Sequence, residues 1–154
     1  MGGMVVPIKK QLGFTLLELI FVVTIIAILA AISIPLYQNL MSKTQVHTAY
    51  HAIATLKIPA SLKIIRSEDI SDASDLGWIA GKSYLFSNDP IVKIDSISGA
   101  ISLEATLDGK VNPVAKGVMV ILSRDVSGHW KCTVKRSDNA SWKDSFAPKT
   151  CDVI

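Results

Sequence analysis

Hydrophobic residues are concentrated in one continuous run near the N-terminus. From Phe14 to Leu36 the chain has 23 residues with a single charge, Glu18. The other clearly polar residues of the run are Thr15, Thr24 and Ser33. A helix rises about 1.5 Å per residue, so this run is long enough to cross a bilayer. The pattern therefore predicts a membrane-spanning helix over residues 14–36.

The helical pattern continues beyond the apolar run, but there it is confined to one face. Hydrophobic residues recur at intervals of three and four from Leu36 to Ile64, while polar residues occupy the other faces. Such spacing is typical of an amphipathic helix that covers a core. We expect one long helix over residues 14–66, kinked or loosened at Pro35 and Pro59, because proline removes an intrahelical hydrogen bond. An alternative is that Pro59 ends the helix early.

The rest of the chain, residues 67–154, predicts a small head domain that contains a sheet. Residues 67–82 are rich in serine, aspartate and glycine and indicate a loop. Apolar or alternating runs then indicate strands at Tyr84–Phe86, Ile91–Ile97, Ala100–Leu107, Gly117–Ser123 and Trp130–Lys135. Turns are expected at Ser98–Gly99 and at Asp125–Gly128. The fold class is therefore α+β, with the amphipathic half of the helix, residues 37–66, packed on an antiparallel sheet of about four strands.

Composition and charge narrow the classes of function. Hydrophobic residues make up 49% of the chain and charged residues 19%, which does not fit intrinsic disorder. Lys9 and Lys10 precede the apolar run and leave 14 basic against 13 acidic residues, which gives no electrostatic argument for a dedicated nucleic-acid binder. The same basic pair should keep the N-terminus in the cytoplasm and direct the head domain outward. A cytosolic soluble enzyme is the poorer interpretation.

The two cysteines, Cys132 and Cys151, have 18 residues between them. Two thiols are too few ligands for a structural zinc site. In a domain on the far side of a membrane we expect them to form one disulfide, and two reduced thiols in a cytoplasmic domain are the alternative. The bridge would close a C-terminal loop over residues 132–151 and stabilise the fold by about 3 kcal/mol.

Glu18 is the residue that a plain membrane anchor does not explain. A carboxylate in an apolar helix is costly unless it stays near the interface, is protonated or has a partner. Glu18 lies five positions after Gly13, so it can sit at the cytoplasmic boundary, and a cation from a neighbouring chain is a further partner. The alternative for the whole segment is an uncleaved signal anchor that holds a periplasmic domain. A cleaved secretory signal would have a shorter apolar core.

The segment Gly13-Phe14-Thr15-Leu16-Leu17-Glu18, followed by a long apolar helix, resembles the class III signal of type IV prepilins. Pro35 and Tyr37 also stand where type IVa pilins have a proline and a tyrosine. The likeness is close over residues 9–50 and extends to the rest of the chain in layout only, including the C-terminal cysteine pair.

The resemblance implies how such a precursor would be processed. A membrane prepilin peptidase and methyltransferase would cut between Gly13 and Phe14, remove the leader over residues 1–13, and methylate the new Phe14 amine. A glycine leaves the scissile carbonyl open to a protease, since it has no side chain. The leader is longer than is usual in the family, so both Met1 and Met4 stay open as the start of translation.

The resemblance also implies a fibre subunit with no cofactor. Subunits would wait in the inner membrane with periplasmic heads, and the pilus assembly machinery would polymerise them into an extracellular homo-oligomer. Pairing of Glu18 with the Phe14 amine of another chain would set the register of the fibre. Adhesion to a host surface, twitching motility and DNA uptake are functions of such fibres. A pseudopilin of a type II secretion system, a minor pilin and a signal-anchored periplasmic enzyme or binding module are the rival interpretations.

Other candidate sites are weaker. His47 and His51 have the i, i+4 spacing of metal ligands, but their helix offers no acidic third ligand. The neighbouring Asp125, Ser127 and His129 fit a turn between strands better than a catalytic triad, so no enzyme is indicated. Near the C-terminus, basic residues such as Lys135 and Arg136 alternate with aromatic ones, which makes DNA binding a secondary hypothesis.

Overall fold

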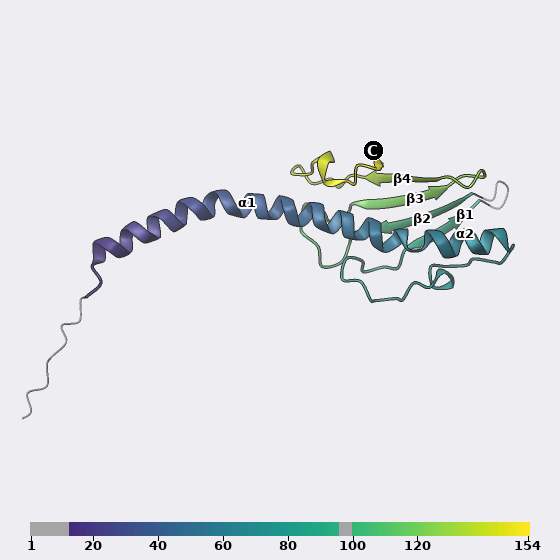
Figure 1. The fold of residues 1–154 in the computed structure, drawn as a ribbon, viewed down its shortest axis with the longest axis horizontal. Coiled ribbons are helices and arrows are strands. Elements are labelled where there is room, and N and C mark those ends of the chain that lie inside the picture. The colour runs from purple at the N-terminus through teal and green to yellow at the C-terminus, as the bar shows by residue number, and fades with distance from the viewer. Residues whose placement is uncertain (1–12, 96–99) are drawn as a thin grey trace, which may run out of the picture. The chain divides into compact units, whose positions relative to one another are not determined.

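The computed structural model describes residues 13–95 and 100–154, and the predicted turn at Ser98–Gly99 lies outside them (Figure 1). The described residues divide between Leu36 and Tyr37 into two compact units, and helix α1 (Leu16–Ala54) belongs to both. The other elements are α2 (Lys57–Ile65), the 3-10 turns η1 (Ser74–Leu76) and η2 (Asp144–Phe146), and the strands β1 (Ile91–Ile94), β2 (Ile101–Thr106), β3 (Met119–Arg124), β4 (Trp130–Lys135) and β5 (Cys151–Val153).

The predicted single helix is two helices in the structure. Pro35 lies within α1, which continues through it, whereas the helix is interrupted at Thr55 and Leu56 and resumes as α2. Pro59 explains the interruption, because it has no N–H to donate to the Thr55 carbonyl and its ring would collide with that carbonyl. The expected loosening of the helix by Pro59 is confirmed, and the alternative that Pro59 ends the helix was wrong, since Pro59 falls within the first turn of α2, where a proline is tolerated.

The end of α2 is fixed by a left-handed cap. Ser67 has a φ of 55°, and its N–H donates to the carbonyl of Ile64 at 3.1 Å. The N–H of Glu68 donates to the carbonyl of Lys63 at 2.9 Å. This pair of hydrogen bonds is the Schellman motif, which satisfies the last helical carbonyls and ends the helix one residue before the predicted boundary.

The sheet has five strands in the order β1-β2-β3-β4-β5. The first four strands pair antiparallel, as predicted, and the expected turn at Asp125–Gly128 joins β3 to β4. Two expectations were wrong. β5 was not foreseen and pairs parallel to β4, while Tyr84–Phe86 forms turns rather than a strand. Because β5 has only three residues, it offers too short a pattern of alternation to detect.

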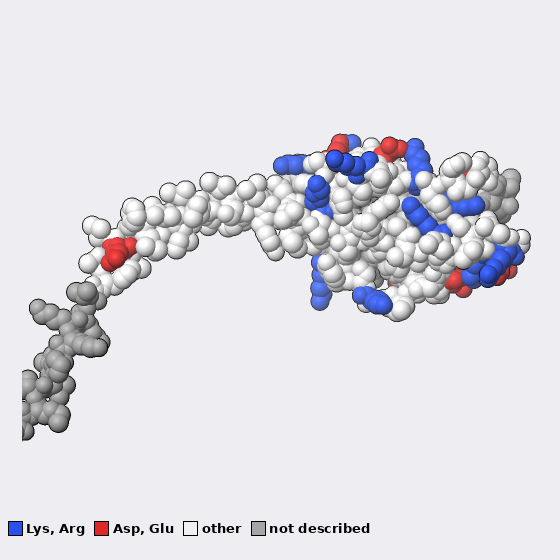
Figure 2. All heavy atoms as spheres, viewed as in Figure 1, with Lys and Arg blue, Asp and Glu red and all other residues white. Residues whose placement is uncertain are grey.

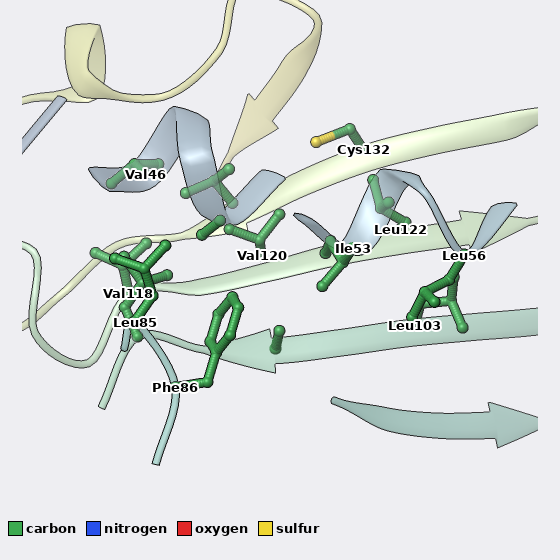
Figure 3. Packing of buried hydrophobic residues seen from close by; sticks show 14 of the residues in the cluster. Val46, Ile53, Leu56, Leu85, Phe86, Leu103, Val118, Val120, Leu122 and Cys132 are labelled. Carbon is green, nitrogen blue, oxygen red and sulfur yellow. The ribbon is translucent and has the colours of Figure 1, made fainter. Parts of the chain in front are cut away.

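The core of the head lies between the helices and one face of the sheet. Alternate residues of β2, β3 and β4 are buried, and the register places Leu103 opposite Leu122 and Val120 opposite Val134. Figure 3 shows side chains from the helices, among them Val46 and Ile53, directed at these strands. The second half of α1, which the sequence predicts to be amphipathic, therefore covers the sheet as expected.

The predicted disulfide between Cys132 and Cys151 is present. The two residues are direct register partners in β4 and β5, with their Cα atoms 4.5 Å apart. The bond therefore joins the C-terminal strand to the sheet at the point where the two strands pair. It closes the loop that contains η2, whose Phe146 is buried.

The segment that precedes β1 is held by backbone hydrogen bonds to Gly109 and Lys110, which follow β2. The N–H of Gly109 donates to the Leu85 carbonyl at 3.0 Å, and that of Lys110 donates to the Tyr84 carbonyl at 2.8 Å. A Cβ atom on Gly109 would lie 2.7 Å from the carbonyl carbon of Leu85 and would also collide with the Tyr84 carbonyl oxygen. Only glycine allows the two backbone segments to come this close.

Asp108 strengthens the same connection. Its carboxylate accepts the N–H of Ser87 at 2.6 Å and the side-chain amide of Asn88 at 2.5 Å. Burial alone would raise the pKa of Asp108, but these hydrogen bonds outweigh burial and lower that pKa. Asp108 therefore contributes fully to stability when the pH is above its ordinary pKa of 3.8. This contribution is lost as the pH falls through the lower pKa that Asp108 has in the folded chain.

Replacing Gly109 by alanine should destabilise the head domain. The Cβ atom forces the backbone at Tyr84 and Leu85 to move, and we expect a loss of about 2 kcal/mol in the free energy of unfolding. Denaturant unfolding of the full chain in detergent micelles measures this loss. The neighbouring change Lys110→Ala removes an exposed side chain and should alter stability by less than about 0.5 kcal/mol. Equal effects of the two changes would contradict the steric explanation.

Removal of the disulfide should cost about 3 kcal/mol of unfolding free energy, because the open chain regains the entropy of the loop. The double variant Cys132→Ala, Cys151→Ala tests this by the same unfolding measurement. A reductant should destabilise the native chain by a similar amount and leave the variant unaffected. An unchanged unfolding midpoint in the variant would show that the β4–β5 pairing holds the C-terminal segment without the bond.

Candidate functional site

The N-terminus of α1 is organised by a threonine cap. Thr15 immediately precedes the helix, and its Oγ1 atom accepts the backbone N–H of Glu18 at 3.2 Å. The Thr15 carbonyl accepts the N–H of Leu19, also at 3.2 Å. Threonine at the N-cap and glutamate three residues later form the sequence pattern of a capping box. Sequence reasoning missed this role of Thr15, although the Thr-x-x-Glu spacing is a known signal for it.

Glu18 lies in the first turn of α1 and is exposed. Its backbone N–H makes the cap, while no hydrogen bond or ion pair joins its carboxylate to another of the described residues. The partial positive charge at a helix N-terminus favours a carboxylate at this position. The side chain is therefore held in a defined place and retains its capacity to accept hydrogen bonds.

Gly13 and Phe14 precede the capped helix as an exposed, non-helical segment. A Cβ atom placed on Gly13 would meet no described atom within 4 Å. Among the described residues, therefore, no atom other than those of its chain neighbours crowds Gly13, which suits access by a protease. The three residues predicted to carry processing and assembly, Gly13, Phe14 and Glu18, lie within six consecutive positions. The leader that precedes them falls outside the described residues.

The apolar part of α1 is covered by nothing in the described chain. Its large side chains are exposed on every face, from Leu16 at 75% to Ile34 at 57%. By length and composition it is the one helix in the described residues that can cross a membrane. Figure 2 shows this unit as white apart from acidic atoms near the start of the helix, where Glu18 is its single charged residue after Gly13. A helix that is apolar all round requires lipid or other helices around it.

The weaker candidates lie in the head domain. Asp125 accepts the backbone N–H of His129 at 2.8 Å within the β3–β4 turn, as a turn residue would. His47 and His51 lie on α1, and the described residues hold no group of three or more histidine, cysteine, aspartate or glutamate side chains placed to bind a metal. His47 lines a cavity that the sequence did not predict, and we return to it below.

The basic and aromatic residues near the C-terminus are partly engaged with one another. Arg136 lies 3.8 Å from Asp144, and Lys131 lies 3.0 Å from Asp152. Trp142 packs edge-on against Phe146 and donates its Nε1–H to Asp144. Two of the cations are therefore balanced by acids, and a tryptophan that could stack on a base is packed within the loop.

Two family models match the chain in the two parts that the structure separates. The model of the prokaryotic N-terminal methylation motif matches residues 8–34, and that of the pilin family of bacterial filaments matches residues 42–152. The first match contains the proposed cleavage position, the capped helix start and most of the apolar run. The second contains the amphipathic part of α1 and the disulfide-linked sheet.

Individual proteins are similar over nearly the whole chain. A fimbrial protein of Pseudomonas aeruginosa is 34% identical over 151 residues, which cover 93% of this chain and 97% of the relative. A type IV major alpha-pilin of Moraxella bovis is 29% identical over 155 residues, covering 93% and 98%.

Among solved structures, that of a Cs1 pilin chimera has a TM-score of 0.56 at 23% identity, which shows a shared fold over 74% of this chain and 98% of the other. The family matches, the relatives and this fold agree with the capped apolar helix and the disulfide-linked head. The chain therefore belongs to the pilin family, as a type IV pilin with a prepilin-type N-terminus.

Proposed function

We propose that this pilus subunit is made as a membrane-held precursor, cut between Gly13 and Phe14, methylated on Phe14 and polymerised through Glu18. One observation carries the proposal. The chain presents an apolar helical segment, residues 16–36, that none of its described residues covers, and Glu18 in its first turn is the only charged residue of that segment. Lipid covers such a helix before assembly, and neighbouring helices cover it in a fibre.

Transfer from membrane to fibre costs little, because apolar helices resemble lipid tails in polarity. The same likeness means that apolar packing alone does not define how far one helix slides along another. A buried charge pair supplies that definition, since breaking it leaves an unpaired charge in an apolar core. Cleavage creates an amine at Phe14, and the Glu18 carboxylate of an adjacent chain is the anion available to it. This pairing would fix the axial register of the fibre.

The location of each part follows from the same scheme. Lys9 and Lys10 keep the leader in the cytoplasm, where the peptidase cuts, and the head domain lies in the periplasm until assembly carries it to the cell surface. A disulfide between Cys132 and Cys151 suits that oxidising route. Energy for polymerisation comes from cytoplasmic ATPases of the inner-membrane assembly machinery, because the subunit itself carries no nucleotide-binding motif.

The fibre is proposed to serve in adhesion and twitching motility. DNA uptake is the weaker proposal, because Arg136 has an acidic neighbour and Trp142 is packed within its loop. The disulfide-linked C-terminal segment supports a pilus subunit over a pseudopilin of a type II secretion system, whose C-terminal end is usually stabilised differently. A minor pilin would share every feature described above, so abundance in purified fibres separates the two types of pilin.

The processing steps predict the mass of the subunit in sheared fibres from the native host. We expect the mass of Phe14–Ile154 with one added methyl group and two hydrogens fewer for the disulfide. Extra mass would indicate glycans. The same mass found only in membranes would favour a minor pilin or a pseudopilin. An uncleaved chain, in a host with an active prepilin peptidase, would contradict the proposed processing.

The change Glu18→Gln should abolish fibres without blocking insertion or cleavage. Glutamine keeps the size of the side chain, and the helix cap survives because the backbone N–H of residue 18 makes it. Only the negative charge needed by the amine is lost, and Glu18→Ala should act in the same way. Electron microscopy of sheared fractions measures assembly, and the mass of the membrane-bound chain measures cleavage.

A matched control is Glu68→Gln, which removes an exposed carboxylate from the head domain. The Glu68 variant should assemble as well as the native chain. Normal fibres from the Glu18 variants would overturn the assembly role of Glu18 and leave the processing proposal intact. Failure of cleavage in Glu18→Gln would instead place the residue in recognition by the peptidase.

A further inference from the structure

A cavity of about 680 Å³ lies between α1 and the C-terminal segment of the head domain. Its helical wall includes Lys43, His47, Tyr50 and His51, and its other wall is formed by Asp144, Ser145, Ala147, Pro148, Lys149, Thr150, Cys151 and Val153. The volume falls in the range of sites that bind small molecules. The sequence predicted only that the disulfide would bound this segment and stabilise the fold, and the cavity is not needed for that.

One polar atom in this wall has no partner. The Nε2 atom of His47 is shielded from solvent, and none of the described residues forms a hydrogen bond with it. Burial, then the neighbouring charges of Lys43 and His51, lower the pKa of His47 below its usual 6.5. A shielded, unpaired imidazole nitrogen is unfavourable, so a rotation of the ring that brings Nε2 to the cavity, where a ligand accepts a hydrogen bond from it, would relieve the cost.

The charges around His47 favour an anion. Lys43 and His51 face the cavity from α1, and Lys149 faces it from the C-terminal segment. Asp144 is the one acidic residue in the wall, and it is already engaged by Arg136 and by the indole N–H of Trp142. In Figure 2, basic atoms lie beside acidic ones over the region of the C-terminal segment. Hydroxyl groups of Ser145 and Thr150 add further donors to the wall.

The apolar part of the wall indicates the size and shape of the ligand. Tyr50, Ala147, Pro148 and Val153 offer a ring face, a methyl group and aliphatic surface beside the basic groups. A single inorganic ion would leave this surface unused. A ring-sized body would cover it, while three phosphate oxygens would accept hydrogen bonds from the surrounding cations.

From these observations we propose that the cavity between α1 and the C-terminal segment binds a phosphomonoester on a sugar-sized body. His47, Lys43 and Lys149 hold the phosphate group, and the apolar wall holds the body. The site lies entirely in the head domain, separate from Gly13, Phe14 and Glu18. Binding can therefore be tested on the single subunit, with Gly13, Phe14 and Glu18 unchanged.

The contribution of His47 to binding should grow as the pH falls. A bound phosphate group favours the imidazolium form of His47 and raises its pKa. By linkage, this contribution to the affinity grows as the pH falls through the range between the free and the bound pKa of His47. Protonation of the phosphate monoester itself, whose second pKa is about 6, acts in the opposite direction. The effect of His47 is therefore measured as the difference between the native chain and His47→Gln.

The test uses the full chain in micelles of a non-ionic detergent, with glucose 6-phosphate as the probe and glucose as its neutral control. Calorimetry at about pH 6 should give saturable binding at least about tenfold tighter for the phosphate ester than for glucose. The imidazole NMR signals of His47 should shift on titration with the ester. Inorganic phosphate should bind more weakly than the ester, because it leaves the apolar wall uncovered.

Two lysine variants separate a specific site from general attraction to a basic surface. Lys149→Gln should weaken binding by about three- to tenfold. Lys135→Gln removes the same charge from a residue outside the cavity wall and should change affinity by less than about twofold. His47→Gln should weaken binding, and the loss relative to the native chain should increase as the pH falls. His51→Gln should have the smaller effect, because His51 is more exposed.

Several outcomes would overturn the proposal. Equal affinity for glucose and its phosphate ester would show that the basic side chains of the cavity do not bind the phosphate group. Equal losses in Lys149→Gln and Lys135→Gln would indicate a diffuse charge effect, and unchanged His47 signals at saturation would place the ligand elsewhere. Should Lys149→Gln unfold, Lys43→Gln provides the second test, since it lies on the opposite wall within the continuous helix α1.

Discussion

The uncovered apolar surface of α1 is the constraint on which the rest of the molecule depends. Within the chain, the described residues offer nothing to pack against Leu16–Ile34, so this surface must be buried in lipid or among other copies. A soluble monomer of the full chain would expose far more apolar surface than soluble proteins tolerate. The apolar part of α1 is therefore suited both to lipid and to a bundle of other apolar helices, which have similar polarity. A fibre subunit that is first held in a membrane has to move from one to the other.

The head domain meets a different demand, since it must fold with a small core. The amphipathic part of α1 supplies one layer, and three central strands supply the buried residues of the other. Local contacts, rather than a larger core, hold the segments at the edges of the head domain in place. Gly109 permits a backbone approach, Asp108 clamps the neighbouring turn, and the disulfide joins β5 to β4. Because a small domain buries a limited share of its surface, such local constraints carry a large part of its stability.

The features that the sequence predicted correctly were those with long or specific patterns. The apolar run, the amphipathic half of α1 and four strands have clear periodicity, and the cysteine pair has a single way to form an intrachain bond. The missed features are short or depend on contacts distant in sequence. The three residues of β5 become a strand because the bond at Cys151 holds them beside β4. Tyr84 and Leu85 pair with the backbone at Gly109 without forming a regular strand.

The candidate processing and assembly residues stand at fixed spacing at the start of the apolar run and stay a prediction, while the structure adds a local geometry that the sequence did not give. The structure assigns the helix cap to the Thr15 hydroxyl and the backbone N–H of Glu18. In a capping box the glutamate side chain can turn back to the N-cap backbone, yet among the described residues the Glu18 carboxylate has no partner. The cavity at His47 was beyond prediction, since its two walls are about a hundred residues apart in the chain.

Under the proposed assembly, the position of Glu18 would connect the membrane and fibre states through one side chain. In the first turn of a capped helix, at the start of the apolar run, the carboxylate would lie near the bilayer interface, where water and the helix dipole reduce the cost of its charge. In a fibre the same carboxylate would lie among apolar helices, where an unpaired charge is far more costly. The precursor would then be stable in the membrane, while a fibre with incorrectly staggered subunits would contain an unpaired charge and be disfavoured. Because the Thr15 hydroxyl accepts the backbone N–H of residue 18, this helix cap does not use the Glu18 carboxylate.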